Sequence, residues 1–163
     1  MKKKIFWSGV LRPLKNIEFI LKLCGDIKRE NLNFKMIFAG KFISDNYQNK
    51  IKDMVNKLDL ENNVSFLGYI NRKELNEVLK IIDINILPSS QEVCPMSVLE
   101  AMTFSKPTIS FNVGGLSDLI QSNFNGILVD KNDFSSFKNN LIKLINDNDF
   151  YSFLAKNCYE KSH

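Results

Sequence analysis

The chain has 163 residues, 44% of them hydrophobic, with a formal net charge of +4 and a pI of about 8.9. This length and composition predict a single globular domain, residues 1–163, with a core of its own and no room for a second domain of that size. The 22 Lys and Arg residues are interspersed with 18 Asp and Glu residues. They form no basic arm, which argues against nucleic acid as a partner.

The cysteine and histidine content excludes several kinds of catalytic site. Cys24, Cys94 and Cys158 lie far apart in the sequence without metal-ligand spacing, and His163 is the only histidine. A reduced, cytoplasmic protein without a metal site is therefore expected, and a Ser-His-Asp hydrolase is not. A passive Cys94 is favoured over a reactive one because no histidine is available to pair with it. No apolar run behind the first lysines suits a signal peptide or a membrane span.

Hydrophobic periodicity in the first half of the chain predicts three strands that alternate with three helices. Asn71 followed by Glu74 predicts a capping box at the third helix. The expected elements are strands at residues 4–8, 34–39 and 64–67, and helices at residues 16–27, 46–58 and 71–81.

The second half continues this alternation and contains no long structureless gap. Strands are expected at residues 84–87, 108–111 and 127–129, and helices from residue 95 onward and at residues 116–121, 134–145 and 149–161. The fold class is therefore α/β, a Rossmann-like doubly wound parallel sheet of about six strands with helices on both faces. The 13 Phe residues are interpreted as core.

Residues 84–100 predict a strand that leads through a polar loop into a helix. Pro88 ends the strand, and Pro95 suits the first helical position. Free N–H groups from Pro95 to Val98 and the helix dipole would favour a phosphate at the carboxyl end of the strand. Glu92 and Glu100 flank this helix start, and carboxylates accept hydrogen bonds from sugar hydroxyls. The buried side of the helix is expected to comprise Met96, Leu99, Ala101 and Met102.

This stretch carries a family resemblance. The run from Pro88 to Met102, with Glu92 and Glu100 separated by seven residues, resembles the E-x7-E segment of retaining family 4 glycosyltransferases. Residues 106–109, 113–115 and 125–129 continue the likeness. The resemblance covers nearly the whole chain and corresponds to the carboxyl-terminal, donor-binding half of the two-domain GT-B architecture.

The resemblance implies a role for each matching residue. Glu100 would accept hydrogen bonds from the ribose hydroxyls, and Glu92 would hold the transferred sugar. Lys15 and the backbone amides near Ser97 would neutralise the departing diphosphate, with a nucleotide-diphosphate sugar as donor substrate and no metal or cofactor. The implied catalytic residues are Glu92 and Lys15, and the implied donor-binding residues are Gly9, Arg12, Lys15, Gly40, Tyr69, Ile70, Glu92, Pro95, Met96, Ser97, Val98, Glu100 and Gly114.

Several positions leave alternatives open. Val10 stands where the family has an arginine, so either Arg12 reaches the same phosphates or the site has one cation fewer. Asp118 stands where glutamate is usual. Tyr69 contacts the nucleobase or is only a strand-edge residue. Two solvated glutamates flanking a helix are the structural alternative to the Glu92 and Glu100 site.

The expected function is transfer of a hexose from the donor, with retention, in glycan or polysaccharide biosynthesis. The acceptor-binding half of such an enzyme is not contained in these residues, so an acceptor-binding domain or subunit is expected as partner. Peripheral association with the inner face of a membrane would then depend on that half. The alternative is a non-catalytic nucleotide-sugar-binding module. A nicotinamide-binding domain is disfavoured because Gly9-Val10-Leu11 replaces the start of G-x-G-x-x-G.

Overall fold

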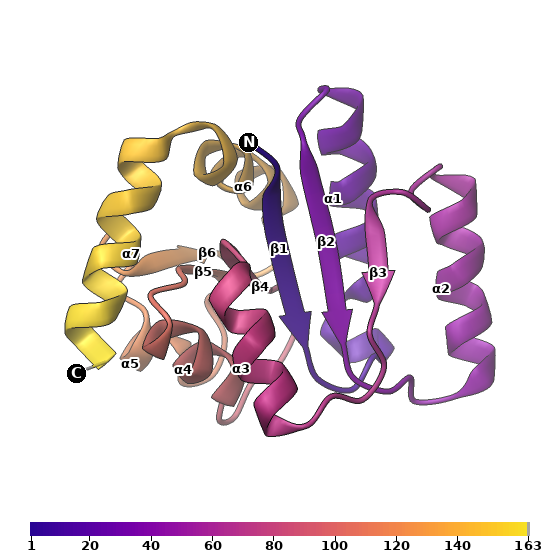
Figure 1. The fold of residues 1–163 in the computed structure, drawn as a ribbon, viewed down its shortest axis with the longest axis horizontal. Coiled ribbons are helices and arrows are strands. Elements are labelled where there is room, and N and C mark those ends of the chain that lie inside the picture. Colours follow the sequence, from indigo (N-terminus) through magenta and orange to yellow (C-terminus); the bar gives the residue numbers. More distant parts are fainter. Residues whose placement is uncertain (163) are drawn as a thin grey trace.

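The computed structural model of the chain describes residues 1–162, and its centre is one parallel sheet (Figure 1). The six strands lie in the order β3-β2-β1-β4-β5-β6. This arrangement confirms the predicted doubly wound α/β fold. The strands are β1 (Lys3–Ser8), β2 (Phe34–Ala39), β3 (Val64–Phe66), β4 (Ile84–Leu87), β5 (Thr108–Phe111) and β6 (Gly126–Val129).

Helices cover both faces of the sheet. In Figure 1, α3 lies in front of the sheet and α1 behind it. Leu79 and Ile82, from α3 and the residue after it, are buried with Phe6 and Ala39 on the front face, whereas the larger core cluster includes the apolar side of α1. The helices are α1 (Ile17–Arg29), α2 (Asp45–Lys57), α3 (Arg72–Ile81), α4 (Met96–Thr103), α5 (Leu116–Leu119), α6 (Phe134–Asn146) and α7 (Asn148–Ser162), with a short 3-10 helix, η1 (Pro13–Lys15), before α1.

Two of the predicted helix starts are confirmed by their caps. The Asn71 side chain accepts from the Glu74 N–H, and the Glu74 carboxylate accepts from the Asn71 N–H. Asp133 caps α6 by accepting from the Ser136 N–H. The short helix η1 was not predicted.

Helix α5 ends earlier than predicted. It was expected at residues 116–121 but stops at Leu119, and Ile120 is already extended. The Gln121 N–H donates to the Asn125 side chain instead of continuing the helix. A side-chain acceptor close in sequence thus replaces the next helical hydrogen bond.

The buried side of α4 also differs from the prediction. Met96 was expected in the core but is 54% exposed, whereas Val98 is fully buried. The helix begins at Met96 and not at Pro95, which is the residue before its first turn. The inward face of α4 consists of Val98, Ala101 and Met102, and Leu99, also expected there, is only partly buried.

The phenylalanines form much of the core, as predicted, with three exceptions. Phe19 of α1 contacts the rings of Phe111, Phe134 and Phe137, and so joins α1 to β5 and α6. The prediction is wrong for the exposed residues, which are Phe124, Phe134 and Phe153.

The sheet order places a switch point between β1 and β4. The chain leaves β1 toward β2 and leaves β4 toward β5, in opposite directions along the sheet. Right-handed crossovers therefore place α1 and α4 on opposite faces. The loops after β1 and β4 diverge there, which leaves a crevice at the carboxyl ends of the strands, where ligands bind in open α/β sheets.

Candidate functional site

Two adjoining cavities lie at this switch point. The first has a volume of about 260 Å³ and the second about 360 Å³, and both are lined by Ser8 and Gly9 at the end of β1. The first is also lined by Lys15, Leu87, Glu92, Cys94, Pro95, Met96, Ser97 and Glu100. The second is also lined by Val10, Ala39, Gly40, Lys41, Tyr69, Ile70 and Leu75. The fold therefore brings most of the predicted site residues to one groove.

Lys15 and Glu92 form an ion pair inside this groove. The Lys15 Nζ lies 2.7 Å from the Glu92 Oε1, and the two side chains are 18% and 9% exposed. The residues come from η1 and from the loop between β4 and α4, which are 77 positions apart in sequence. Glu92 Oε2 has no hydrogen-bond partner among residues 1–162, so one carboxylate oxygen can accept from a ligand hydroxyl.

Glu100 is also paired with a cation. Its Oε1 accepts a hydrogen bond from the guanidinium of Arg72, at the start of α3. The Glu100 side chain is 17% exposed, whereas that of Arg72 is 69% exposed. An ion pair this exposed stabilises little, so a ligand can displace Arg72 at small cost. Arg72 was not predicted as a site residue, because it lies 28 positions from Glu100 and no motif in the sequence connects the two residues.

The amides at the start of α4 are less free than expected. The Met96 N–H donates to the Cys94 carbonyl at 2.9 Å, and the Val98 N–H donates to the Pro95 carbonyl at 3.0 Å. Within residues 1–162 the Ser97 N–H donates to no acceptor. The expectation of free N–H groups from Pro95 to Val98 is therefore wrong for Met96 and Val98. The Ser97 N–H is the donor that is available to a ligand at this helix start.

Gly114 lies against the backbone of Glu92. It has a φ of +56°, and a Cβ built on it would lie 1.7 Å from the Glu92 carbonyl oxygen. Gly114 therefore touches the backbone of a predicted site residue and does not line the cavity itself. The next residue, Gly115, has room for a Cβ, since its nearest neighbour would be 3.7 Å away.

The second cavity is formed where β1 and β2 end. A Cβ on Gly40 would lie 1.6 Å from the Gly9 carbonyl oxygen, so only glycine allows these two strand ends to approach so closely. Tyr69 is 72% exposed, and the Lys41 Nζ lies 5.7 Å from the centre of its ring. The cavity is thus a shallow, partly apolar extension of the groove.

Arg12 lies apart from these cavities. It is exposed and lines neither of them. Its predicted contact with a diphosphate stays a prediction. The cations that the structure places at the two carboxylates are Lys15 and Arg72.

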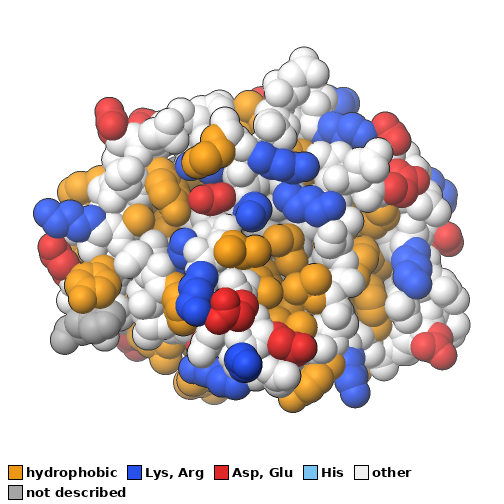
Figure 2. Space-filling model, viewed as in Figure 1, with side chains coloured by type: hydrophobic (Ala, Val, Ile, Leu, Met, Phe, Trp, Pro, Cys, Tyr) orange, Lys and Arg blue, Asp and Glu red, His pale blue; other side chains and the backbone are white. Residues whose placement is uncertain are grey.

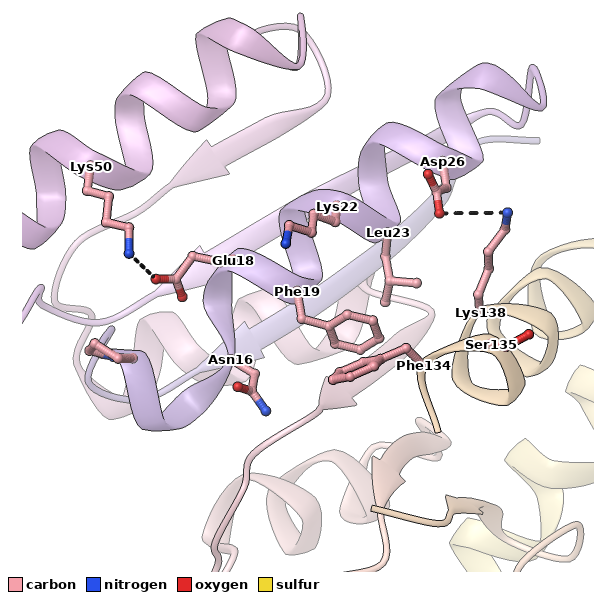
Figure 3. Close-up of a pocket in the computed structure, with 11 residues that line it drawn as sticks. Asn16, Glu18, Phe19, Lys22, Leu23, Asp26, Lys50, Phe134, Ser135 and Lys138 are labelled. Carbon is pink, nitrogen blue, oxygen red and sulfur yellow. Dashed lines mark hydrogen bonds and ion pairs between the residues drawn. The ribbon is translucent and has the colours of Figure 1, made fainter. Parts of the chain in front are cut away.

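A larger cavity lies elsewhere on the molecule, along the outer side of α1. Its volume is about 770 Å³, and it extends between α2 and α6 (Figure 3). Figure 3 shows Phe19 and Phe134 facing one another there, with Lys50 bonded to Glu18 and Lys138 to Asp26. Burial raises the pKa of Glu18, but hydrogen bonds from Lys50 and Tyr47 outweigh burial and leave this pKa lowered. These residues match none of the predicted donor-binding positions.

The three cysteines differ in their surroundings. Burial raises the pKa of Cys24, and burial raises the pKa of Cys158 to about 12. Both thiols therefore stay protonated and unreactive near neutral pH. Cys94 is exposed and lines the first cavity.

The residues that the structure describes offer neither a metal-binding cluster nor a membrane-spanning helix. Across residues 1–162, no group of three or more His, Cys, Asp and Glu side chains is arranged to hold a metal ion. Within the same residues, no helix combines the length and the apolar character that crossing a bilayer requires.

Comparisons with known proteins agree with this geometry. Residues 1–161 match the family described as Glycosyl transferases group 1. An uncharacterized glycosyltransferase of Methanocaldococcus jannaschii is 31% identical over 157 residues, which are 94% of this chain and 41% of that protein. The UDP-Gal:alpha-D-GlcNAc-diphosphoundecaprenol alpha-1,3-galactosyltransferase of Escherichia coli is also 31% identical, over 94% of this chain and 39% of its own length. The chain thus spans about 40% of the curated relatives it matches.

Solved structures show the same fold at low sequence identity. The Anabaena protein Alr3699/HepE, solved in complex with UDP and glucose, superposes with a TM-score of 0.88 at 20% identity, over 99% of this chain and 43% of its own. The C-terminal domain of the group 1 glycosyl transferase LpcC from Francisella tularensis superposes with a TM-score of 0.89 at 20% identity, over 98% of this chain and 83% of its own. The described fold is therefore that of a Rossmann-like domain of GT-B glycosyltransferases.

Proposed function

The chain belongs to the glycosyl transferases group 1 family, and we propose from this that it is the donor-binding half of a retaining family 4 glycosyltransferase. The observation that carries the proposal is the placement of Lys15, Glu92 and Glu100 on one cavity at the β1 and β4 switch point. Chance would rarely bring two carboxylates, a lysine and an unengaged helix-start amide to the site where this fold binds ligands.

The donor class follows from these groups. The Glu100 carboxylate would release the Arg72 guanidinium and accept hydrogen bonds from the two ribose hydroxyls instead. Glu92 retains one free carboxylate oxygen that can accept from a hydroxyl of the sugar. The Lys15 ammonium and the Ser97 N–H supply positive charge and a donor for the diphosphate. A nucleotide-diphosphate hexose matches this set. We place UDP first among nucleotides because the galactosyltransferase relative is named for a UDP sugar.

The chemistry is a displacement at the anomeric carbon. The bond from that carbon to the diphosphate oxygen breaks, and an acceptor oxygen bonds to the same face of the sugar. Negative charge builds up on the leaving phosphate, where Lys15 stabilises it, and groups arranged in advance in this way are worth roughly 3 kcal/mol each. The acceptor hydroxyl passes its proton to the departing diphosphate oxygen, and Glu92 orients the sugar that the acceptor attacks.

An acceptor-binding partner is proposed on two grounds. The chain spans about 40% of its curated relatives. In addition, large apolar side chains are exposed at the carboxyl ends of β1 to β4, and Figure 2 shows hydrophobic surface toward the ends of β1 and β2. A second domain would cover this surface and close the groove. The exposed residues are Val10, Leu14, Ile43, Leu67, Tyr69, Val93 and Met96.

The proposal is tested by donor binding to the purified chain. We expect UDP sugars at 100 times their dissociation constant to raise the melting temperature by roughly 5–10 °C, since such binding adds about 2.7 kcal/mol of stability. The substitution Glu100→Ala should abolish the rise. Glu77→Ala is the matched control, because Glu77 also pairs with a cation, Lys80, but lies outside both cavities.

Two outcomes would count against this function. If no nucleotide sugar stabilises the wild-type chain, or if Glu100→Ala responds as well as the wild type, the donor site is misplaced. Binding without transfer has a different meaning. If a supplied acceptor domain and acceptor give no product while the donor binds, the chain is a non-catalytic nucleotide-sugar-binding module.

A further inference from the structure

Asn16 joins the two loops that carry the Lys15 and Glu92 pair. Its Nδ2 donates to the Pro88 carbonyl at 2.7 Å and to the Ser90 Oγ at 3.2 Å. Pro88 and Ser90 belong to the loop between β4 and α4, which also carries Glu92. Asn16 is partly buried, and Figure 3 shows its amide projecting from the start of α1, away from Leu23 and Asp26.

The backbone conformation directs this amide. Asn16 has a φ of 55° and a ψ of 42°, a left-handed conformation that asparagine tolerates better than most side chains. Its N–H donates to the Pro13 carbonyl at 2.9 Å, and its carbonyl accepts from the Ile20 N–H at 3.2 Å. The residue thus closes η1 and begins α1 through its backbone, while its side chain is left to bind the neighbouring loop.

A second contact links the same two segments. The Ser90 N–H donates to the Leu14 carbonyl at 3.2 Å. Together with the Asn16 amide, this bond ties residues 14–16 to residues 88–90 on one side of the ion pair. Further along the same loop, Gly114 lies against the Glu92 carbonyl. Two separate segments of the chain, residues 14–16 and residue 114, therefore contact this loop.

From this geometry, and resting on the proposed donor site, we infer that Asn16 is a positioning residue that holds the Glu92 loop against Lys15. Without its amide, residues 88–90 would be tied to residues 14–16 by the Ser90 N–H bond to Leu14 alone. The Lys15 and Glu92 charges would then be held less firmly at their separation of 2.7 Å. The donor would then have to order the loop when it binds, which lowers affinity.

The substitution that tests this inference is Asn16→Gly. Glycine adopts the left-handed conformation without strain, so the change removes the amide and keeps the backbone. The matched control is Asn31→Gly, because Asn31 also has a positive φ of 58° and makes no side-chain hydrogen bond within residues 1–162. Asn31 lies between α1 and β2, at the opposite end of the sheet from the site.

Hydrogen exchange of the ligand-free chain gives the first measurement. We expect Asn16→Gly to speed amide exchange in residues 89–94, between the two prolines, and Asn31→Gly to leave that segment unchanged. Unchanged exchange in the first variant would overturn the inference, and this result does not depend on any donor.

Donor affinity gives the second measurement. Calorimetry with a UDP sugar should show about tenfold weaker binding for Asn16→Gly, a loss matched by two hydrogen bonds of ordinary net strength, and less than twofold for Asn31→Gly. In a Lys15→Ala background, Asn16→Gly should add less than a further twofold, because Asn16 acts through the Lys15 and Glu92 pair.

The outcomes separate the two proposals. Equal affinity of wild type and Asn16→Gly, or full additivity with Lys15→Ala, would show that Asn16 has only a structural role. A wild-type chain that binds no donor overturns the donor site, and the exchange experiment then decides the role of Asn16 by itself.

Discussion

Because Gly114 has no side chain, the loop that carries the Glu92 carboxylate can lie close against it. Its backbone is left-handed, and it lies against the Glu92 carbonyl. We expect Gly114→Ala to lower the free energy of unfolding by about 2 kcal/mol, through backbone strain and displacement of the loop, and to weaken donor binding. Urea denaturation and calorimetry measure both effects.

Gly115→Ala provides the control for this prediction. Gly115 has an ordinary φ of −83° and space for a Cβ, so its substitution should be close to neutral. If the two alanine variants lose the same stability and the same affinity, Gly114 does not support Glu92 in the way the contact suggests.

The exposed thiol of Cys94 allows a chemical test of donor binding in the first cavity. Because the thiols of Cys24 and Cys158 are buried and their pKa values raised, a thiol reagent should modify Cys94 alone in the folded chain. A donor at ten times its dissociation constant should slow this labelling about tenfold, since about one site in ten stays empty.

Labelling kinetics with and without UDP sugar measure the effect, and Cys94→Ser identifies the fast thiol. Rapid reaction of a second cysteine in the folded chain would contradict the burial that the structure shows. Unprotected labelling in the presence of a donor that binds would place the donor outside the first cavity.

In helix α4 the structure buries a different residue from the one expected from the sequence. Val98 is fully buried and Met96 is 54% exposed. Val98→Ala should therefore cost about 2 kcal/mol through lost burial and a cavity, whereas Met96→Ala should stay within about 0.5 kcal/mol. The free energies of unfolding in urea test this, and the reverse order would restore the sequence-based assignment.

Strand assignments from the sequence were accurate because each strand is short and largely apolar and is followed within two residues by Gly, Pro or a polar residue. The strands β2, β4 and β5 have the predicted bounds. The helix starts capped by Asn71 and Asp133 were equally readable, since the capping residues lie three positions from their partners. Local chemistry determines these elements, so a local pattern can find them.

The site was predictable in part for a related reason. Glu92, Glu100, Pro95 and Lys15 lie in motifs whose spacing is visible along the chain. Arg72 and Asn16 were missed because their partners are 28 and more than 70 positions away. Contacts of this kind depend on how the strands are ordered in the sheet.

The strand order explains why the groove is built from both halves of the chain. Gly9, Lys15 and Tyr69 come from the side of β1 to β3, whereas Glu92 and Glu100 come from the side of β4 to β6. Neither half contains the complete set of proposed donor-binding groups. The proposed donor site therefore forms only when the two halves of the sheet meet.

The strands that join these halves are paired over a short distance. β1 and β4 share the register pairs Ile5 with Ile84 and Phe6 with Asn85, whereas β1 and β2 are in register over six residues each. A small change in twist at this seam would alter the width of the groove before it disturbed either three-stranded half. The distance from Gly9 to the two carboxylates would then vary with the relative orientation of the two halves of the sheet. A bound nucleotide sugar that contacts both halves would fix this distance and stabilise the β1–β4 junction.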